Sequence, residues 1–313
     1  MMMCVVATVL STLAFGTRTD TTLGVRPGTR LDVNNFGGEI AVQVWERNAV
    51  RVEATHSSRV QVVIEGTGSS VEVRARSSRG VPLPGRVDYR ITVPRWMALV
   101  LSGIYTDVSV EGTKGEVSVE TVKGDVNVRG GEGFVKLSSI QGSVTVDGAR
   151  GRLEASSVNE GVNVSDVVGD VSVEAVNGDV QLRGIVSLLV EAATVNGDVT
   201  YIGAVRDGGR YRFASHNGDL IVAIPERANA TVSVATFDGE FESSFPVQLT
   251  EARKGRRFNF TLGSGSAQID LETFDGTIKL SRAVMIRGIQ RATRHPRMHE
   301  VPEEVVKEKE ESP

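Results

Sequence analysis

The strongest constraint on the fold of this chain is a unit that recurs every eighteen residues. In each copy an apolar residue precedes a short turn built from a polar residue, glycine and an acid, as in VKGDV and VNGDV. Apolar residues alternate with small or polar ones on both sides of that turn. The apolar residue before the turn recurs at intervals of eighteen at Ile104, Val122, Ile140, Val158 and Val176. A period of this length has to be explained before any local motif.

The same column continues beyond its regular part. Val195, His216 and Phe237 follow at intervals of 19, 21 and 21 residues, Phe274 returns after 37 more, and Phe36 looks like an early member. Because most of these residues are apolar, we expect the column to face inward. We expect His216, which shares the column, to be a partly buried corner residue.

The residues around each turn have the alternation of β-strands. Val117, Val119, Val126 and Val128 alternate with polar residues, which predicts strands with one buried face. A tight Asn-Gly link usually indicates a hairpin, but hairpins alone do not require the whole unit to recur. A coil of two short strands does require it, because one coil cannot bury its own apolar face. The sequence therefore predicts an all-β parallel solenoid with repeats of 18 to 21 residues.

The pattern divides the chain into four segments. Residues 1–16 are apolar, with small residues at Ala14 and Gly16, which predicts a signal peptide cleaved after Gly16. Residues 17–98 alternate less regularly and predict an N-terminal β coil and cap. Residues 99–282 are the regular repeats, and Phe245 to Gly265 is expected to be an excursion that adds a strand. Residues 283–313, rich in arginine and then glutamate, predict a disordered or partly helical tail.

Composition excludes several classes of protein. The net charge of −4 leaves no basic field for nucleic acid, so we expect no nucleic-acid partner. The only cysteine, Cys4, would leave with the signal peptide, which rules out disulfides, cysteine–zinc sites and cysteine nucleophiles in the mature chain. After that cleavage no transmembrane span is expected, because a span needs ~20 apolar residues.

The ordered set of motifs resembles a known family. VNGDV with its preceding VEA or ATV, the entry LDVNNFGGEIAVQVWERNAVRVEA and the exit LETFDGTIKL are together similar to the bacterial putative-adhesin family with DUF4097-type β-strand repeats. The resemblance spans roughly residues 25 to 282. The sequence departs from the pattern at Thr106, where glycine is usual, and at Glu160-Gly161, where the glycine has slipped by one position. The resemblance implies an envelope or extracellular β-solenoid and brings no catalytic residues with it.

No catalytic or cofactor site is predicted. The four histidines (His56, His216, His295, His299) do not form a helical metal-binding pair, and no nucleophile elbow or phosphate-binding loop is present. One metal alternative stays open, because acids recur in the turns and coils of a solenoid stack ~4.8 Å apart. Turn formation explains the same acids, and the interpretation as a Ca²⁺ column is the weaker one. The column consists of Asp125, Asp179, Asp198 and Asp219.

Three classes of function remain. The first is an exported, non-enzymatic interaction module, an adhesin or cell-envelope protein whose partner is an unidentified envelope or surface polymer or protein. The second is a structural or envelope-stress protein without a specific ligand. The third is a carbohydrate-active β-helix enzyme, which eighteen-residue coils disfavour because they leave no room for cleft-building loops. Outward polar positions form mixed-charge ladders on the regular coils: Ser118, Glu120, Asn127, Arg129, Ser172, Glu174, Gln181 and Arg183.

Overall fold

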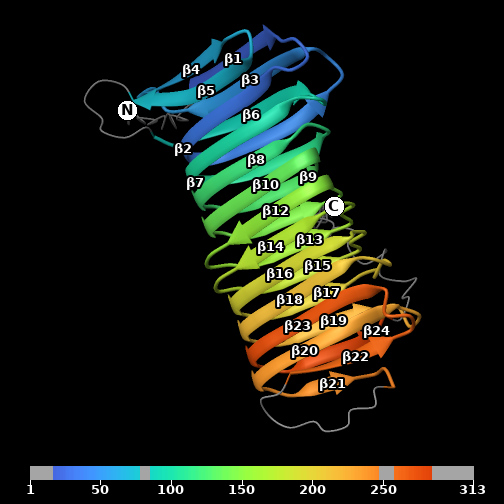
Figure 1. Ribbon diagram of the computed structural model, residues 1–313. Coiled ribbons are helices and arrows are strands. Elements are labelled where there is room, and N and C mark those ends of the chain that lie inside the picture. The colour runs from blue at the N-terminus through green and yellow to red at the C-terminus, as the bar shows by residue number, and fades with distance from the viewer. Residues whose placement is uncertain (1–16, 78–84, 247–256, 284–313) are drawn as a thin grey trace, which may run out of the picture. The chain divides into compact units, whose positions relative to one another are not determined.

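The computed structural model describes residues 17–77, 85–246 and 257–283, and every regular element in these ranges is a β-strand (Figure 1). None of the described residues forms a helix that could cross a membrane. The predictions for the signal peptide, Cys4, residues 284–313 of the charged tail, His295 and His299 concern residues outside these ranges.

Two parallel ladders of strands build the regular part of the stack. The first strand of each coil belongs to one ladder: β8 (Val117–Lys123), β10 (Glu132–Gln141), β12 (Arg150–Ser157), β14 (Val171–Ala175), β16 (Leu189–Asn196) and β18 (Arg210–Asn217). The second strand belongs to the other: β9 (Val126–Gly130), β11 (Val144–Asp147), β13 (Val162–Ser165), β15 (Val180–Arg183), β17 (Val199–Ile202) and β19 (Leu220–Ile224). Each strand pairs in parallel with its equivalent in the next coil, which confirms the predicted parallel solenoid.

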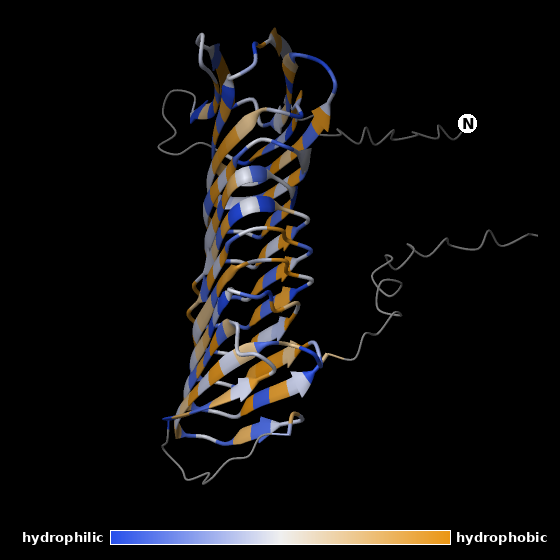
Figure 2. Ribbon diagram, turned by 45° about the vertical axis from the view of Figure 1, so that its right-hand side comes forward, coloured by the Kyte–Doolittle hydropathy of each residue, from blue (hydrophilic) through white to orange (hydrophobic). Residues whose placement is uncertain are grey.

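The register stacks like residues from coil to coil. Leu153 on β12 pairs with Val135 before it and Val171 after it. On the other ladder Val162 pairs with Val144 and Val180. These inward residues are almost fully buried, and Figure 2 shows hydrophobic positions recurring along the stack. The coils therefore supply one another with a core, as a solenoid requires.

Antiparallel strands extend the N-terminal end of the stack. β2 (Arg30–Trp45) and β7 (Ala98–Thr113) are long strands that pair with each other in parallel. The first part of β2 also pairs with β5 (Ser70–Ser77), which pairs antiparallel with β4 (Val60–Gly66). Its second part pairs with β6 (Val87–Pro94), which continues antiparallel to β3 (Ala49–His56) and then β1 (Thr17–Gly24). These added strands cover the end of the parallel stack, which would otherwise be an open edge.

The C-terminal coils are not stacked in sequence order. The last coil, β23 (Ala267–Asp275) and β24 (Ile278–Arg282), pairs with β18 and β19 on one side. Its other side pairs with β20 (Ala230–Asp238) and β21 (Phe241–Ser243), which precede it in the chain. The described part of the predicted excursion includes β22 (Arg257–Leu262), which pairs antiparallel with β20. The sequence predicted this strand but not the insertion of the last coil.

The expectation that the apolar column faces inward is wrong. Its members do stack from coil to coil, but their side chains point outward and are 37–45% exposed: Ile104, Val122, Ile140, Val158, Val176 and Val195. The reason is the two-residue period of a strand. Val117 and Val119 are buried, so Thr121 also faces inward and Val122 faces solvent. His216 is likewise exposed rather than partly buried.

Candidate functional site

The outward column forms one continuous row along the corner between the two ladders. We call it the corner column; in spatial order it comprises Ile104, Val122, Ile140, Val158, Val176, Val195, His216, Phe274 and Phe237. Phe36, partly buried, lies before Ile104, and its ring meets Tyr105 edge-on at 5.8 Å between centroids. Large exposed apolar patches on soluble proteins typically mark interaction sites. The column is therefore the candidate interaction surface among the described residues.

Small hydroxyl residues hold the corner in place from the inside. The residue just before each column member faces inward, and in most coils its hydroxyl donates to a backbone carbonyl at the corner of the preceding coil in space. Ser139 Oγ, for example, lies 3.0 Å from the carbonyl oxygen of Gly124. The other donors are Thr121, Ser157, Thr194, Ser215 and Thr273. A larger apolar residue in these positions would leave that carbonyl without its side-chain partner.

The glycine of each turn is required by close contact between coils. A Cβ built on Gly218 would lie 1.9 Å from the carbonyl oxygen of Gly197, and the φ of Gly218 is +153°. Gly124 meets the Thr106 carbonyl in the same way, at 2.1 Å. Any side chain would collide with the backbone of the neighbouring coil, so only glycine fits here.

An asparagine ladder runs directly beside the corner column. The side-chain amide of Asn196 donates to Asn177 Oδ1 at 2.9 Å, and that of Asn217 donates to Asn196 Oδ1 at 2.8 Å. Asn159 begins the ladder, with its Oδ1 at 3.4 Å from Asn177 Nδ2. These side chains are exposed, so each one also presents hydrogen-bonding atoms to solvent.

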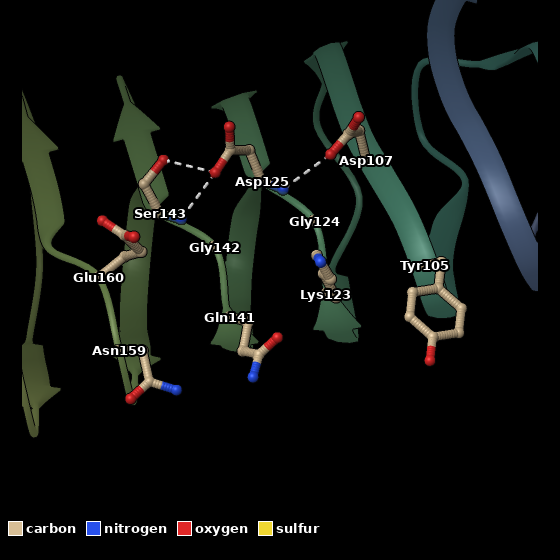
Figure 3. Close-up of a pocket in the computed structure, with 10 residues that line it drawn as sticks. All are labelled: Tyr105, Asp107, Lys123, Gly124, Asp125, Gln141, Gly142, Ser143, Asn159 and Glu160. Atoms are coloured by element: carbon tan, nitrogen blue, oxygen red, sulfur yellow. Dashed lines mark hydrogen bonds between the residues drawn. The ribbon is translucent and has the colours of Figure 1, made fainter.

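The aspartates considered as a Ca²⁺ column form a second ladder on the far side of the glycines. Asp179 Oδ1 accepts a hydrogen bond from the backbone N–H of Asp198, and Asp198 Oδ1 accepts one from Asp219, at 2.9 and 2.8 Å. Asp125 Oδ1 accepts from both the N–H and the hydroxyl of Ser143 (Figure 3). These bonds join successive coils, so they differ from the local bond of an Asx turn, in which the side chain accepts from its own backbone two residues on. Within the described ranges no three His, Cys, Asp or Glu side chains converge as metal ligands.

One carboxylate of this ladder has a perturbed pKa. The backbone N–H of Thr277 donates to Asp219 Oδ1 at 2.8 Å, and Lys279 Nζ lies 3.0 Å from Asp219 Oδ2. Hydrogen bonding to Thr277, with Lys279 as the second favourable partner, lowers the pKa of Asp219 below its ordinary value. Asp219 therefore bears a negative charge at neutral pH.

Aromatic rings replace the aliphatic members at the C-terminal end of the column. The rings of Phe274 and Phe237 stack with their centroids 4.7 Å apart and 8° between their planes. The imidazole of His216 stacks on the other face of Phe274 at 4.8 Å. Phe274 can lie between the other two only because the last coil is inserted, so the sequence order of the column did not reveal this stack. Phe237 is the most exposed apolar member, at 64%.

The corner is hollowed beside the first half of the column. A shallow hollow of ≈ 970 Å³ follows the turns of four coils and is lined by Tyr105, Asp107, Lys123, Asp125, Gln141, Ser143, Asn159 and Glu160, with two glycines at its floor (Figure 3). Its polar groups form parallel rows rather than a focused cluster. The hollow suits an extended contact better than the enclosure of a small molecule.

The outward polar positions lie on the two flat sides of the stack, as the alternation predicted. Glu120 forms an ion pair with Lys136 of the next coil at 3.6 Å, and Arg129 pairs with Glu111 at 3.4 Å. Both pairs are exposed, and such pairs add little stability. The sequence thus located these side ladders correctly, whereas it assigned the corner column to the core.

Comparison with known proteins gives a family and a set of related structures. The toastrack DUF4097 family model matches residues 28–281. No curated protein matches the chain. A putative cell adhesion protein from Clostridium sporogenes aligns at 11% identity over 85% of this chain and 100% of its own, with a TM-score of 0.23. Putative adhesins from Bacteroides fragilis and Parabacteroides distasonis each align at 12% identity and over 97% of their own length. They cover 84% and 85% of this chain, with TM-scores of 0.37 and 0.32.

Proposed function

The chain belongs to the toastrack DUF4097 family, and we propose that it is an exported, non-enzymatic module that binds a partner of the cell envelope or surface along its corner column. The observation that carries this proposal is the row of exposed side chains from Ile104 to Phe237, which is apolar at every member except His216. Eight of the nine members are apolar, and contiguous exposed apolar patches typically mark interaction sites. Contact with a partner supplies a reason for the row.

Binding without turnover fits the arrangement of polar groups. Catalysis needs a nucleophile or base held with its partner in a concave site. The corner instead repeats one set of groups in every coil, and its aspartate oxygens accept backbone hydrogen bonds. Repeated weak contacts along one partner add up through effective concentration, which is how a uniform surface can reach useful affinity.

Export is part of the proposal and is supported by the sequence alone. The apolar residues 1–16 end in small residues and are followed by a polar segment. N-terminal sequencing of the protein from its native host tests this, with a mature terminus near Thr17 expected. An intact Met1 on cytosolic protein would contradict export.

The test of function measures binding and turnover together. Purified protein is incubated with a glycan panel and with a washed envelope fraction, and both retention and release of reducing ends are measured. The double variant Val158→Ser/Val176→Ser removes apolar surface from the corner column. A matched control, Val168→Ser/Val186→Ser, removes apolar residues of similar exposure that are not column members.

We expect retention without release of reducing ends, and weaker retention for the corner variant than for its control. Hydrolysis or lyase activity that a single acid-to-amide change abolishes would instead identify a carbohydrate-active enzyme. Equal retention of both variants would show that the corner column is not the contact surface.

A further inference from the structure

The turns beside the corner column are strongly acidic. Ten turns are counted here, each made of the three residues that follow Phe36 or one of the nine members of the column. Together they contain ten carboxylates and one cationic residue, Lys123. The carboxylates are Glu39, Asp107, Asp125, Glu160, Asp179, Asp198, Asp219, Asp238, Glu240 and Asp275. An exposed apolar row with an acidic row alongside is complementary to a partner that combines apolar and basic side chains.

The chain itself shows how a cation fits this row. Asp219 uses Oδ1 to accept the backbone N–H of the next coil, and its Oδ2 binds the ammonium group of Lys279 at 3.0 Å. Asp125, Asp179 and Asp198 use Oδ1 in the same way. In Figure 3 the second oxygen of Asp125 makes no hydrogen bond to the residues drawn. A lysine or arginine of a partner can therefore bind these carboxylates without breaking the turn.

The spacing of the column selects the backbone conformation of the partner. Successive coils lie ~4.8 Å apart, whereas side chains on one face of an extended strand repeat every ~6.7 Å and lose register within two coils. One turn of an α-helix advances ~5.4 Å, so apolar residues three or four positions apart stay close to successive column members. The six aliphatic members from Ile104 to Val195 span about 24 Å, the length of a helix of about 16 residues.

A second copy of the chain would match the spacing but not the charge. Two corner columns packed face to face and antiparallel bring their acidic rows together, and opposed like charges are unfavourable. A basic partner has no such conflict. Charge thus disfavours antiparallel self-association, and spacing disfavours an extended strand.

We propose that the corner column docks an amphipathic α-helix whose apolar stripe is flanked by lysine or arginine. The inference rests on the proposed function, because it names the occupant of the same surface. Apolar side chains of the helix lie over Val122, Ile140, Val158 and Val176, and its cations reach the aspartate row beside them. Basic amphipathic helices that bind in this manner form a recognised class of ligand.

The experiment measures binding of labelled peptides to the full chain by fluorescence anisotropy. The probe is a synthetic 16-residue helical peptide with leucines at helical spacing and arginines on both flanks. One control peptide has the same composition with leucines spread around the helix, and a second alternates leucine and arginine to favour a strand. We expect the amphipathic helix to bind at least ~10-fold more tightly than either control, a ratio that corresponds to ~1.4 kcal/mol.

Protein variants then locate the site. Asp125→Asn/Asp179→Asn/Asp198→Asn keeps each acceptor oxygen of the turn and removes three charges. Exposed ion pairs contribute ~0.2–1 kcal/mol each, so we expect roughly tenfold weaker binding, and less difference at high salt. A matched control, Asp147→Asn/Glu111→Gln/Glu191→Gln, removes three carboxylates from the flat sides of the stack and should retain nearly full affinity. Val158→Ser/Val176→Ser should also weaken binding.

Equal binding of the three peptides, or equal loss in the two triple variants, would overturn the inference. A dimer that Val158→Ser/Val176→Ser dissociates would assign the column to a second copy and would also overturn it. If envelope retention depends on the column while the helical peptide does not bind, the inference fails and the proposed function stands. If retention does not depend on the column, the proposed function itself fails.

Discussion

Replacing valine by threonine at Val173 and at Val176 compares the inside of the stack with the corner column. The two residues lie three positions apart, and the substitution keeps side-chain volume while exchanging a methyl group for a hydroxyl. Val173 is fully buried and pairs with Ala155 and Ala192 in the neighbouring coils, so the new hydroxyl has no side-chain partner among these alanines. Val176 is 40% exposed, and water can bind the hydroxyl there.

The expected free energies differ clearly. Burying a hydroxyl without a hydrogen bond costs ~1–3 kcal/mol in proteins, so Val173→Thr should lower the free energy of unfolding by about that amount. Val176→Thr should change it by less than ~0.5 kcal/mol, as is usual for surface substitutions. Urea unfolding followed by circular dichroism measures both. The transition midpoint is the quantity to compare, because stacked repeats do not always unfold in two states.

The opposite result would refute the assignment of faces. A costly Val176→Thr together with a neutral Val173→Thr would mean that the corner column faces the core. Equal costs at the two sites would mean that the strand does not keep its alternation up to the turn.

Three further predictions concern the corner itself. Gly218→Ala should reduce stability by several kcal/mol and lower soluble yield, because the new Cβ would meet a backbone carbonyl at 1.9 Å; a variant with the wild-type Tm would contradict that contact. Asp179→Ala should cost ~1 kcal/mol in urea unfolding and Asp179→Asn much less, because only the amide keeps the acceptor for the backbone N–H of the next coil; equal costs would argue against the ladder. Hydrogen bonding to Thr277 and pairing with Lys279 lower the pKa of Asp219. The contribution of Asp219 to the free energy of unfolding is therefore present above its unfolded-state pKa of about 4 and is lost as the pH falls through the lower folded-state value. The stability difference between wild type and Asp219→Asn should shrink in acid, and a constant difference would contradict the linkage.

Much of this fold follows from sequence because the repeat is strict. Val117, Val119, Val126 and Val128 alternate as strands, and recurrence of the whole unit is explained by stacked coils rather than by isolated hairpins. The structure confirms parallel pairing between successive coils.

Two features could not be taken from hydrophobicity. Val122 is apolar, but the alternation of inward and outward side chains along the strand makes Thr121 the inward residue. The small Thr121 side chain fits in the crowded corner, where its hydroxyl donates to a backbone carbonyl. Counting by twos from Val119 would have revealed this. The insertion of the last coil beside β18 had no such signal, because any coil with the same register can pair with any other, and the column repeats equally well in either order.

The corner column as a contact surface is tested most directly by cysteine labelling. The chain has one native cysteine, Cys4, so with Cys4→Ser a single new cysteine reports one position. Val173→Cys, Val176→Cys and Val186→Cys are treated with a maleimide, free and after binding to the envelope fraction. We predict no labelling at Val173, labelling at Val186 in both conditions, and labelling at Val176 that envelope binding suppresses. Equal labelling of Val176→Cys in the free and bound protein would contradict the account.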